Sequence, residues 1–315
     1  MGVSQTGPLT CPALNAATRL CAVFGSPIRH SASPAMHNAA FTELGLNWRY
    51  LAFEVAPEQL REAIAGAQAM RFAGLNLTVP HKLLAVPLVD VLDESARIWG
   101  AVNTIRIEGR HPGGPWLPLR MFENETPAEL RSHGFNTDAE GLVISLEQDL
   151  AVTLREASVL LLGAGGAGRT AALKLAESGV AELFLVNRTR SKTEEVAAEI
   201  RRRWPHVRVT VGYPPTTTSV DLLLNATSLG LKATDASPLD AGAFALKQAA
   251  AVYDMIYKPA ETPLLAAARA AGCRTANGLG MLVWQGARAF EIWTGAANVP
   301  VTTMRKAAEH SIYAS

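Results

Sequence analysis

Apolar and polar positions in the first part of the chain follow two alternating periods. Short apolar runs at residues 21–25, 48–55 and 72–79 have the length and composition of strands. Between them, at residues 33–46 and 57–70, apolar residues recur at helical spacing. Strands that alternate with amphipathic helices predict a parallel α/β architecture.

Two serines lie where the first predicted strand leads into the first predicted helix. Ser33 precedes Pro34; serine is a favoured N-cap residue, and proline is favoured at the first helical position. Ser33 is therefore predicted to cap the helix, whereas Ser31 has no capping role in this interpretation. Hydroxyl groups at a helix amino terminus can bind a carboxylate together with free backbone N–H groups.

The stretch GLNLTVPHK, residues 74–82, predicts a strand with one polar face, because Asn76 and Thr78 alternate with apolar residues. Pro80 ends the strand, and Lys82 follows it. An unpaired polar group among apolar neighbours costs roughly 1–3 kcal/mol, so Asn76 and Thr78 are expected to have partners, for which ligand hydroxyls are one source. From the residues alone, Lys82 is explained as a surface lysine after a strand.

The alternation of predicted strands and helices stops at residues 110–134. In this segment apolar residues follow neither strand nor helix spacing, and several turn-forming residues occur. This segment is predicted to be an extended loop or an elaborated hairpin. Asp138 lies shortly after it, and from the residues alone it is explained as the N-cap of the helix that follows.

A second alternation begins with an apolar strand that leads into Gly163, Gly165 and Gly168, followed by a helix and a further strand at residues 181–187. These elements form a complete βαβ unit of the kind that binds a dinucleotide. The glycines allow a tight turn and let the backbone approach a pyrophosphate at the positive end of the helix. The alternative is that the glycines only allow the helix to pack against the strand.

The residues after the second strand of this unit indicate which dinucleotide is bound. A carboxylate there would bind the ribose hydroxyls of NAD, but this chain has Asn187, Arg188, Thr189 and Arg190, with Lys192 close behind. Guanidinium groups and a hydroxyl suit a phosphate, so the sequence predicts NADP. The alternative is a solvated helix start, although a basic first turn opposes the helix dipole unless an anion offsets it.

Composition narrows the classes of partner. The chain has 315 residues, 49% hydrophobic and 18% charged, and at ~150 residues per domain it is expected to form about two domains. Its net charge of +1 gives no electrostatic reason to expect nucleic acid or an acidic membrane as partner. A small-molecule ligand is the expectation.

Cysteine usage and the amino terminus bear on location. Cys11, Cys21 and Cys273 have neither metal-ligand nor redox spacing, so we expect no metal site and reduced thiols in a cytoplasmic protein. No apolar run approaches the ~18 residues that span a bilayer. The amino-terminal stretch lacks a basic region followed by a hydrophobic one. Residues 1–19 are rich in small and polar residues, so they are expected to be a loose leader.

Eight motifs occur in the order found in the shikimate dehydrogenase family, which the chain resembles from about residue 21 to its end. They are GSPIRHSASPAMHN, GLNLTVPHK, GAVNT, GFNTDAEGL, GAGGAGR, VNRT, LNATSLG and NGLGMLVWQGARAFEIW. The resemblance implies an α/β fold with two domains and a cleft between them. One is an α/β substrate domain (residues 20–137 and 278–315), and the other is a Rossmann doubly wound NADP-binding domain (residues 138–277). It also implies the reversible, NADPH-dependent reduction of 3-dehydroshikimate to shikimate in aromatic amino acid (chorismate) biosynthesis.

The same resemblance assigns roles to residues. It makes Lys82 and Asp138 the catalytic pair: Lys82 can stabilise and protonate the oxygen that becomes an alkoxide, and Asp138 can orient the ammonium and a substrate hydroxyl. The division of proton transfer between them stays open. The implied substrate-binding residues are Ser31, Ser33, Asn76, Thr78, Asn103, Tyr257 and Gln285. The implied cofactor-binding residues are Gly163, Gly165, Gly166, Ala167, Gly168, Asn187, Arg188, Thr189, Arg190, Thr227, Gly278 and Met281.

Three features differ from the family pattern. A long stretch, residues 107–134, joins two motifs that the family connects by a short hairpin; Ala139 follows Asp138 where glycine is common; and the 212–220 loop contains a proline pair. Since the long stretch could reshape one edge of the pocket, a quinate or aminoshikimate dehydrogenase is the alternative. A non-catalytic, cofactor-sensing relative is a further alternative, and the protein is expected to be a monomer or a homodimer.

Overall fold

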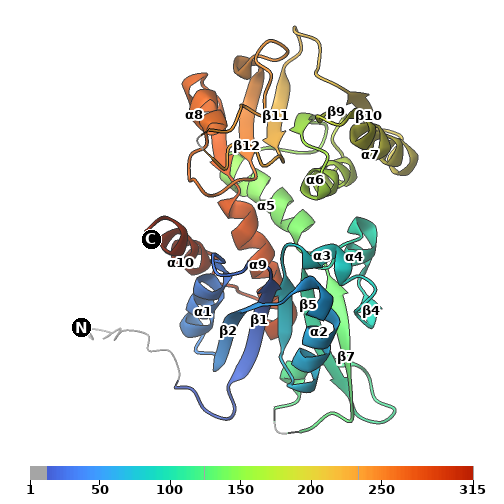
Figure 1. The fold of residues 1–315 in the computed structure, drawn as a ribbon, viewed down its shortest axis with the longest axis vertical. Helices are drawn as coiled ribbons and strands as arrows, with labels where there is room; N and C mark the ends of the chain where they lie inside the picture. Colours follow the sequence, from blue (N-terminus) through green and yellow to red (C-terminus); the bar gives the residue numbers. More distant parts are fainter. Residues whose placement is uncertain (1–12, 124, 233, 315) are drawn as a thin grey trace, which may run out of the picture. The chain divides into compact units, whose positions relative to one another are not determined.

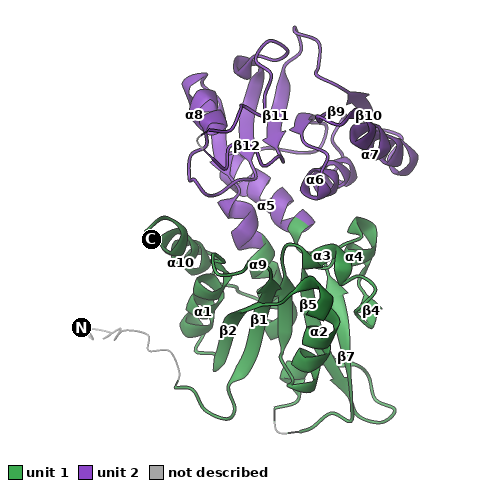
Figure 2. Cartoon of the chain, in the orientation of Figure 1, with its two compact units in different colours: residues 1–138, 285–315 green, residues 139–284 purple. Residues whose placement is uncertain are grey.

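The computed structural model of the chain describes residues 13–123, 125–232 and 234–314. The protein forms two compact units, which Figure 2 shows in different colours. Unit 1 contains the chain up to Asp138 and again from Gln285, and unit 2 runs from Ala139 to Trp284. Most of the predicted leader lies outside the described residues.

The chain passes between the units at two helices. α5 (Asp138–Leu150) begins at the first crossing, and α9 (Leu279–Thr294) contains the second. The sequence predicted the second domain boundary between residues 277 and 278, which lies before α9. The two units instead divide within α9, between Trp284 and Gln285. The first turn of α9 packs on α5, where Gly280 approaches Ser145 and Asp149 so closely that a Cβ would not fit. This packing keeps the start of α9 in unit 2.

Within the described residues, unit 1 is built on a seven-stranded sheet in the order β2-β1-β3-β5-β7-β4, with β6 paired to β5. The strands are β1 (Arg19–Gly25), β2 (Trp48–Glu54), β3 (Gly74–Leu77), β4 (Val91–Leu92), β5 (Thr104–Arg110), β6 (Leu117–Pro118) and β7 (Glu129–Phe135). The helices, besides the carboxyl-terminal part of α9, are α1 (Ser33–Glu43), α2 (Leu60–Ala69), α3 (His81–Leu84), α4 (Glu94–Trp99) and α10 (Val301–Tyr313).

The sheet of unit 1 is mixed: the predicted parallel pairing is confirmed for β1, β2 and β3 but does not extend to β5. β1 pairs in parallel with β2 and β3, but β5 is antiparallel to both β3 and β7. β5 and β7 are joined by a connection without a crossover helix, which permits only antiparallel pairing of neighbouring strands. Of the two predictions for residues 110–134, the elaborated hairpin is therefore confirmed.

Helices cover both faces of this sheet. α2 packs its Leu60 and Ile64 into a cluster with Phe24, Leu75 and Leu77. α1 lies beside β2 on the opposite face, next to α10 (Figure 1). There Tyr50 stacks on His37 of α1 at a ring distance of 4.3 Å. The two faces differ because successive side chains of a strand point to opposite sides.

Unit 2 has, within the described residues, a six-stranded sheet in the order β10-β9-β8-β11-β12-β13, in which each pair of neighbouring strands is parallel. Its strands are β8 (Ser158–Leu162), β9 (Glu182–Val186), β10 (Arg208–Val211), β11 (Val220–Asn225), β12 (Ala249–Asp254) and β13 (Arg274–Asn277). Its further helices are α6 (Gly166–Glu177), α7 (Arg190–Arg203) and α8 (Pro263–Ala270). The strand order reverses between β8 and β11, and α/β sheets bind ligands at the carboxyl ends of strands at such a switch point. The predicted doubly wound unit is confirmed.

Other predictions concern the amino terminus, thiols and metals. Asn47 bonds to Thr18 (2.9 Å) and Asn15 (3.0 Å), so this end of the predicted leader is attached to unit 1 rather than loose. Cys21 and Cys273 are free thiols, and Cys11 lies outside the described residues. In the part of the chain that the structure describes, His, Cys, Asp and Glu form no cluster of three or more that could hold a metal ion. None of the described helices is long and apolar enough to cross a membrane.

Candidate active site

Lys82 and Asp138 form an ion pair in unit 1, with 2.7 Å between Lys82 Nζ and Asp138 Oδ2. Lys82 lies on α3, just after β3, and Asp138 is the first residue of α5, just after β7. β3 and β7 both flank β5, so the sheet brings together two residues that are far apart in sequence. The side chain of Lys82 is 32% exposed and that of Asp138 is 15% exposed, so the pair is held in place yet open to a ligand.

The carboxylate of Asp138 is held in a fixed orientation. Its Oδ1 accepts a hydrogen bond from Asn103 Nδ2 at 2.9 Å, while Asn103 Oδ1 accepts one from the backbone N–H of Thr137 at 2.8 Å. The backbone N–H of Asp138 donates to Asn136 Oδ1 at 3.0 Å. Asn136, and not Asp138, thus accepts from the first turn of α5, and the interpretation of Asp138 as an N-cap is wrong. The acid is left available for Lys82.

Gln285 joins this cluster from α9. Its Oε1 lies 3.4 Å from Asn103 Nδ2. The structure therefore brings four of the predicted site residues into one hydrogen-bonded group: Lys82, Asp138, Asn103 and Gln285. Their polar atoms are of the kinds that hold hydroxyl and carbonyl groups, and the cluster includes one ammonium that can give a proton.

Asn76 has protein partners, so ligand hydroxyls are not needed to explain it. It is only 6% exposed. Its amide nitrogen donates to the Asn103 carbonyl (3.1 Å) and to Thr104 Oγ1 (3.0 Å), and its oxygen accepts from the Tyr50 hydroxyl at 2.7 Å. Asn76 therefore supports Asn103 from behind. Thr78 lies beyond the end of β3 and is partly exposed.

The two serines have other local roles than the sequence indicated. Ser33 is the first residue of α1, whose N-cap is Ala32, so the prediction that Ser33 caps the helix is wrong. Ser31 Oγ accepts a hydrogen bond from the Ser33 N–H at 3.3 Å. Ser31 thus supplies the oxygen at the helix start, because its loop places the side chain two residues ahead of a free N–H.

Tyr50 is a site residue that the sequence reasoning missed. Its hydroxyl donates to Asn76 and is hydrogen-bonded to Ser33, so it links the serine loop to the group around Asn103. Burial raises the pKa of Tyr50 well above its usual value. The side chain of Asn38 bonds both backbone groups of Tyr50, at 2.8 and 2.9 Å, which fixes α1 to β2. A tyrosine on an apolar strand gave no signal of this role.

The glycine-rich loop of unit 2 divides into glycines that pack and glycines that face open space. Gly168 lies against the Gly163 carbonyl with no room for a Cβ, and Gly163 has φ +107°. The packing alternative therefore describes these two residues. At Gly165 and Gly166 an added Cβ would have no neighbour within 4 Å, so the backbone at the start of α6 is open to a ligand. Ala167 is exposed beside them.

The loop after β9 contacts the glycine-rich loop through Asn187. Asn187 Oδ1 accepts from the Ala164 N–H at 3.1 Å, and its amide donates to the Thr189 carbonyl at 2.9 Å. Arg188, Thr189 and Arg190 are exposed. Arg190 forms an ion pair with Glu194 one turn along α7, at 2.8 Å, as expected for a solvated helix start. Arg188 is the other exposed guanidinium of this loop.

The remaining predicted residues lie at the carboxyl ends of the neighbouring strands of unit 2. Thr227 follows β11, and Tyr257, whose pKa burial raises, follows β12. Gly278 follows β13 and packs so closely on the Met255 carbonyl that a Cβ would not fit, while Met281 is in the first turns of α9. Tyr257 belongs to unit 2, unlike the other predicted substrate-binding residues.

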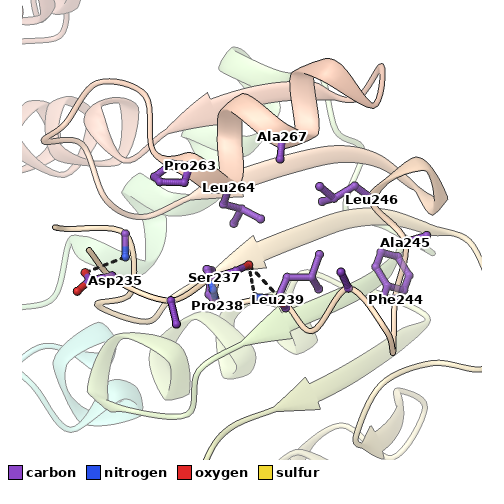
Figure 3. Close-up of a pocket in the computed structure, with 13 residues that line it drawn as sticks. Asp235, Ser237, Pro238, Leu239, Phe244, Ala245, Leu246, Pro263, Leu264 and Ala267 are labelled. Carbon is purple, nitrogen blue, oxygen red and sulfur yellow. Dashed lines mark hydrogen bonds between the residues drawn. The ribbon is translucent and has the colours of Figure 1, made fainter. Parts of the chain in front are cut away.

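A pocket of about 390 Å³ lies elsewhere in unit 2, between the 235–246 segment and α8 (Figure 3). Leu239, Phe244, Leu246 and Leu264 contribute much of its lining. Ser237 Oγ bonds the backbone of Leu239, and Asp235 accepts from backbone N–H groups in its own loop. None of the predicted site residues lines it.

Comparisons with known proteins indicate the family of the chain. Models of three families match the chain: the shikimate dehydrogenase substrate binding domain (residues 23–105), shikimate / quinate 5-dehydrogenase (145–232) and the shikimate 5'-dehydrogenase C-terminal domain (278–309). A shikimate dehydrogenase (NADP(+)) of Methanopyrus kandleri is 38% identical over 299 residues, which cover 93% of this chain and 96% of that protein.

Two solved structures are similar along nearly the whole chain. Shikimate 5-dehydrogenase of Thermus thermophilus, in complex with NADP(H) and shikimate, has 35% identity and a TM-score of 0.76, covering 93% of this chain and 99% of that one. The 5-ketofructose reductase of a Gluconobacter species (strain CHM43) has 32% identity and a TM-score of 0.77, covering 93% and 98%. The resemblance drawn from the eight motifs is confirmed, and the chain belongs to the shikimate dehydrogenase family.

Proposed function

We propose that this protein is an NADP-dependent shikimate dehydrogenase, an oxidoreductase that reversibly reduces 3-dehydroshikimate to shikimate in aromatic amino acid (chorismate) biosynthesis. The observation that carries the proposal is the Lys82–Asp138 pair at 2.7 Å, with Asn103 on the second carboxylate oxygen. The names of the relatives support the substrate and the cofactor. The free thiols Cys21 and Cys273 are consistent with a cytoplasmic location.

The ion pair contains the two groups that the reduction of a carbonyl needs, a proton donor and a carboxylate that orients it. NADPH, when bound, supplies the hydride. As the carbonyl oxygen gains charge, the Lys82 ammonium can stabilise it and then donate a proton from Nζ. Asp138 holds that nitrogen through Oδ2 and is itself held by Asn103, so the ammonium needs little reorganisation when the charge develops. In the oxidation direction the same groups receive the proton from the hydroxyl.

The loop before α1 suits the carboxylate of the ring acid. The amino terminus of a helix favours an anion. At α1, Pro34 has no N–H and the Ser33 N–H donates to Ser31 Oγ, so these two residues offer no backbone donor to a ligand. Ser31 is partly exposed, and because its oxygen is the acceptor in that hydrogen bond, its proton is left for a ligand. Ser33 is buried and supports the loop through Tyr50. We infer that Ser31 donates to the carboxylate and that Ser33 completes its site.

The residues of unit 2 fit NADP. Open space at Gly165 and Gly166 lets a pyrophosphate approach the amino terminus of α6, a favourable place for an anion. The exposed guanidinium of Arg188 and hydroxyl of Thr189 suit the additional phosphate that distinguishes NADP from NAD. Asn187 fixes the distance between the two loops through its bonds to Ala164 and Thr189.

A quinate dehydrogenase is the second candidate function. One matching family model is described as shikimate / quinate 5-dehydrogenase, and the similar 5-ketofructose reductase bears the name of a different substrate. The long β5–β7 hairpin leads directly to Asp138, so a change in its course can reshape the site beside the acid. Aminoshikimate differs at a ring substituent and belongs in the same comparison.

A substrate panel tests the proposal. Oxidation of shikimate, quinate and aminoshikimate is followed with NADP and with NAD, and the Lys82→Ala variant serves as the control for background activity. We expect the highest kcat/KM for shikimate with NADP. A higher value for quinate would replace the proposal by the second candidate. NADP binding without turnover of any member would favour the non-catalytic alternative. The prediction of a monomer or homodimer is checked on the same sample by light scattering.

A further inference from the structure

A buried carboxylate in unit 2 joins two loops and the start of a helix. Asp254 is the last residue of β12 and has no exposed surface. Its Oδ1 accepts from the Ile256 N–H at 3.1 Å and from Asn225 Nδ2 at 3.0 Å. Its Oδ2 accepts from Thr262 Oγ1 at 2.7 Å. The residues Asn225, Asp254 and Thr262 are called the carboxylate clamp below.

Asn225 extends the clamp to the loop after β11. It is the last residue of that strand and lies opposite Asp254 in the sheet. Its Oδ1 accepts from both the N–H (3.0 Å) and the hydroxyl (2.8 Å) of Thr227, and its amide also reaches the Leu229 carbonyl at 3.3 Å. The position of Thr227 is therefore set by Asn225, whose amide is in turn oriented by Asp254.

Thr262 extends the clamp in the other direction. It is the N-cap of α8, and its hydroxyl oxygen accepts from the Leu265 N–H at 3.3 Å. Asp254 thus holds both ends of the segment from residue 255 to 262, at Ile256 and at Thr262. Tyr257 lies in this segment, directly after Ile256. Both loops that the clamp fixes contain residues assigned to the ligands.

The chemistry of the clamp is unusual for a purely structural contact. Asp254 accepts from a side-chain amide, a backbone N–H and a hydroxyl, and burial raises the pKa of this carboxyl despite them. A buried carboxylate is costly to retain, and apolar groups of similar shape often stabilise a protein equally well. A carboxylate, however, is an acceptor on all its lone pairs, so it can orient three donors from different segments at once.

We propose that Asp254 is a positioning residue that holds Thr227 and Tyr257 in the geometry that cofactor and substrate require. The proposal rests on the proposed function for the roles of these two residues. Asp254 acts through the clamp and need not touch either ligand. Loss of the clamp is expected to weaken NADPH binding and to raise the KM for the ring acid, because both loops then sample other positions.

Removal and conservative replacement of the carboxylate test the proposal. In Asp254→Ala all three hydrogen bonds are lost, whereas Asp254→Asn keeps an oxygen toward Asn225 and Ile256, and its amide can donate to the Thr262 hydroxyl. We expect Asp254→Ala to raise the Kd of NADPH and the KM of the acid by about tenfold, the factor that corresponds to roughly one lost hydrogen bond. Asp254→Asn should restore most of the loss.

Val252→Ala is the matched control. Val252 is fully buried on the same strand, and its truncation removes core contacts without changing the clamp. It should lower the Tm but leave the Kd and KM unchanged. If Asp254→Ala lowers the Tm in the same way and leaves the Kd of NADPH and the KM unchanged, Asp254 is structural only and the proposal is overturned.

Two further measurements keep the test decisive. If Asp254→Ala does not fold, Thr262→Val and Thr262→Ser replace it, because only serine keeps the hydroxyl that bonds Asp254. Equal ligand affinities in these two variants would overturn the proposal. NADPH binding is followed by its fluorescence, which does not require turnover. A wild-type protein that binds NADPH but does not oxidise shikimate would refute the proposed function, while the comparison of variants would still test the clamp.

Discussion

Each unit contains a buried carboxylate, and the surroundings of the two differ. In unit 1, Asp138 pairs with Lys82, and Glu108 of the β5–β7 hairpin bonds Arg106, Arg131 and His133. In unit 2, Asp254 is as deeply buried as Glu108, but the groups that donate to it in the clamp are neutral. Burial acts to raise the pKa of both carboxyls. The hydrogen bonds from His133, Arg106 and Arg131 outweigh it at Glu108 and bring the pKa to about 2, whereas the pKa of Asp254 stays raised.

The proposed function also assigns different charges to the sites of the two units. In the proposed function, unit 1 contains the group that gives a proton, and a carboxylate orients its ammonium. In the same proposal unit 2 binds a cofactor that is itself negatively charged, so its guanidinium groups can stay exposed until the phosphate binds. Variants of unit 1 should therefore change steps that involve the ring acid, and surface variants at the cofactor loop should change the choice of cofactor.

The largest expected effect comes from Lys82→Ala. Loss of the ammonium removes a charge and a proton that matter most in the transition state, so kcat should fall by about 10²–10⁴-fold while KM changes little. Steady-state kinetics in both directions measure it. Lys174→Ala, which breaks an ion pair of 2.6 Å on α6, is the control and should keep normal activity. Near-normal turnover in a folded Lys82→Ala protein would remove Lys82 from the reaction.

The second effect concerns the cofactor in unit 2. Arg188→Ala should weaken NADP binding by about 1.5–3 kcal/mol, the scale of a hydrogen bond to a charged group, and leave NAD little changed. Kinetics with each cofactor at saturating acid give the two values. Arg208→Ala, an exposed arginine on β10 that pairs weakly with Glu182 at 3.7 Å, provides the control. Equal losses for NADP and NAD would show that Arg188 does not bind the distinguishing phosphate.

The fold of unit 2 was predictable because its signals are local. Each strand of a parallel sheet is a short apolar run, and the glycine pattern lies between a strand and a helix. The fold of unit 1 was predicted less well. The direction of β5 is set by its pairing with β7, and the segment that connects these strands shows no regular pattern of apolar and polar residues. The apolar pattern identifies a strand, but it does not state which neighbour the strand pairs with or in which direction.

The site shows the same limit. The family motifs named Lys82 and Asp138, but their contact joins residues 56 positions apart, which spacing alone does not reveal. Tyr50 and Asp254 were missed because a tyrosine on an apolar strand and an acid at a strand end have ordinary explanations. Their roles depend on Asn76 and Asn225, which are 26 and 29 positions away. Ser31 and Ser33 were assigned the wrong local roles, since the helix starts one residue earlier than a cap at Ser33 requires.

The third prediction uses acid to compare the buried carboxyls. The folded-state pKa of Glu108 is about 2, below the usual 4.5, so ionised Glu108 stabilises unit 1 above pH 4.5, and this contribution is lost as the pH falls from 4.5 toward 2. Glu108→Gln should lower the free energy of unfolding at pH 7 by about 2–3 kcal/mol and reduce its dependence on pH in that window. Urea unfolding between pH 2 and 7 measures both.

Glu129→Gln is the control for this experiment. Glu129 pairs with Arg110 at 2.6 Å in the same hairpin, but its side chain is 48% exposed, and exposed pairs contribute little to stability. If Glu108→Gln keeps the full dependence on pH of the wild type, the cations around Glu108 do not stabilise it as a charge, and the contrast with Asp254 disappears.

The smallest effects are expected at the two serines. They distinguish support of the start of α1 from binding of the ring acid within unit 1. Ser31→Ala removes the oxygen that accepts the Ser33 N–H, so the free energy of unfolding should fall by about 0.5–1 kcal/mol. Ser33→Ala removes the bond to Tyr50 and should cost about 0.5–1.5 kcal/mol. Both should raise the KM of the ring acid and leave the affinity for NADP unchanged, because we propose that this part of unit 1 holds the carboxylate. Chemical unfolding beside kinetics separates the two roles, with Ser178→Ala at the C-cap of α6 as a control that should change stability alone. Unchanged KM in both variants would mean that the carboxylate binds elsewhere, while a loss of stability in Ser33→Ala alone would mean that the Ser31 oxygen does not support the helix start.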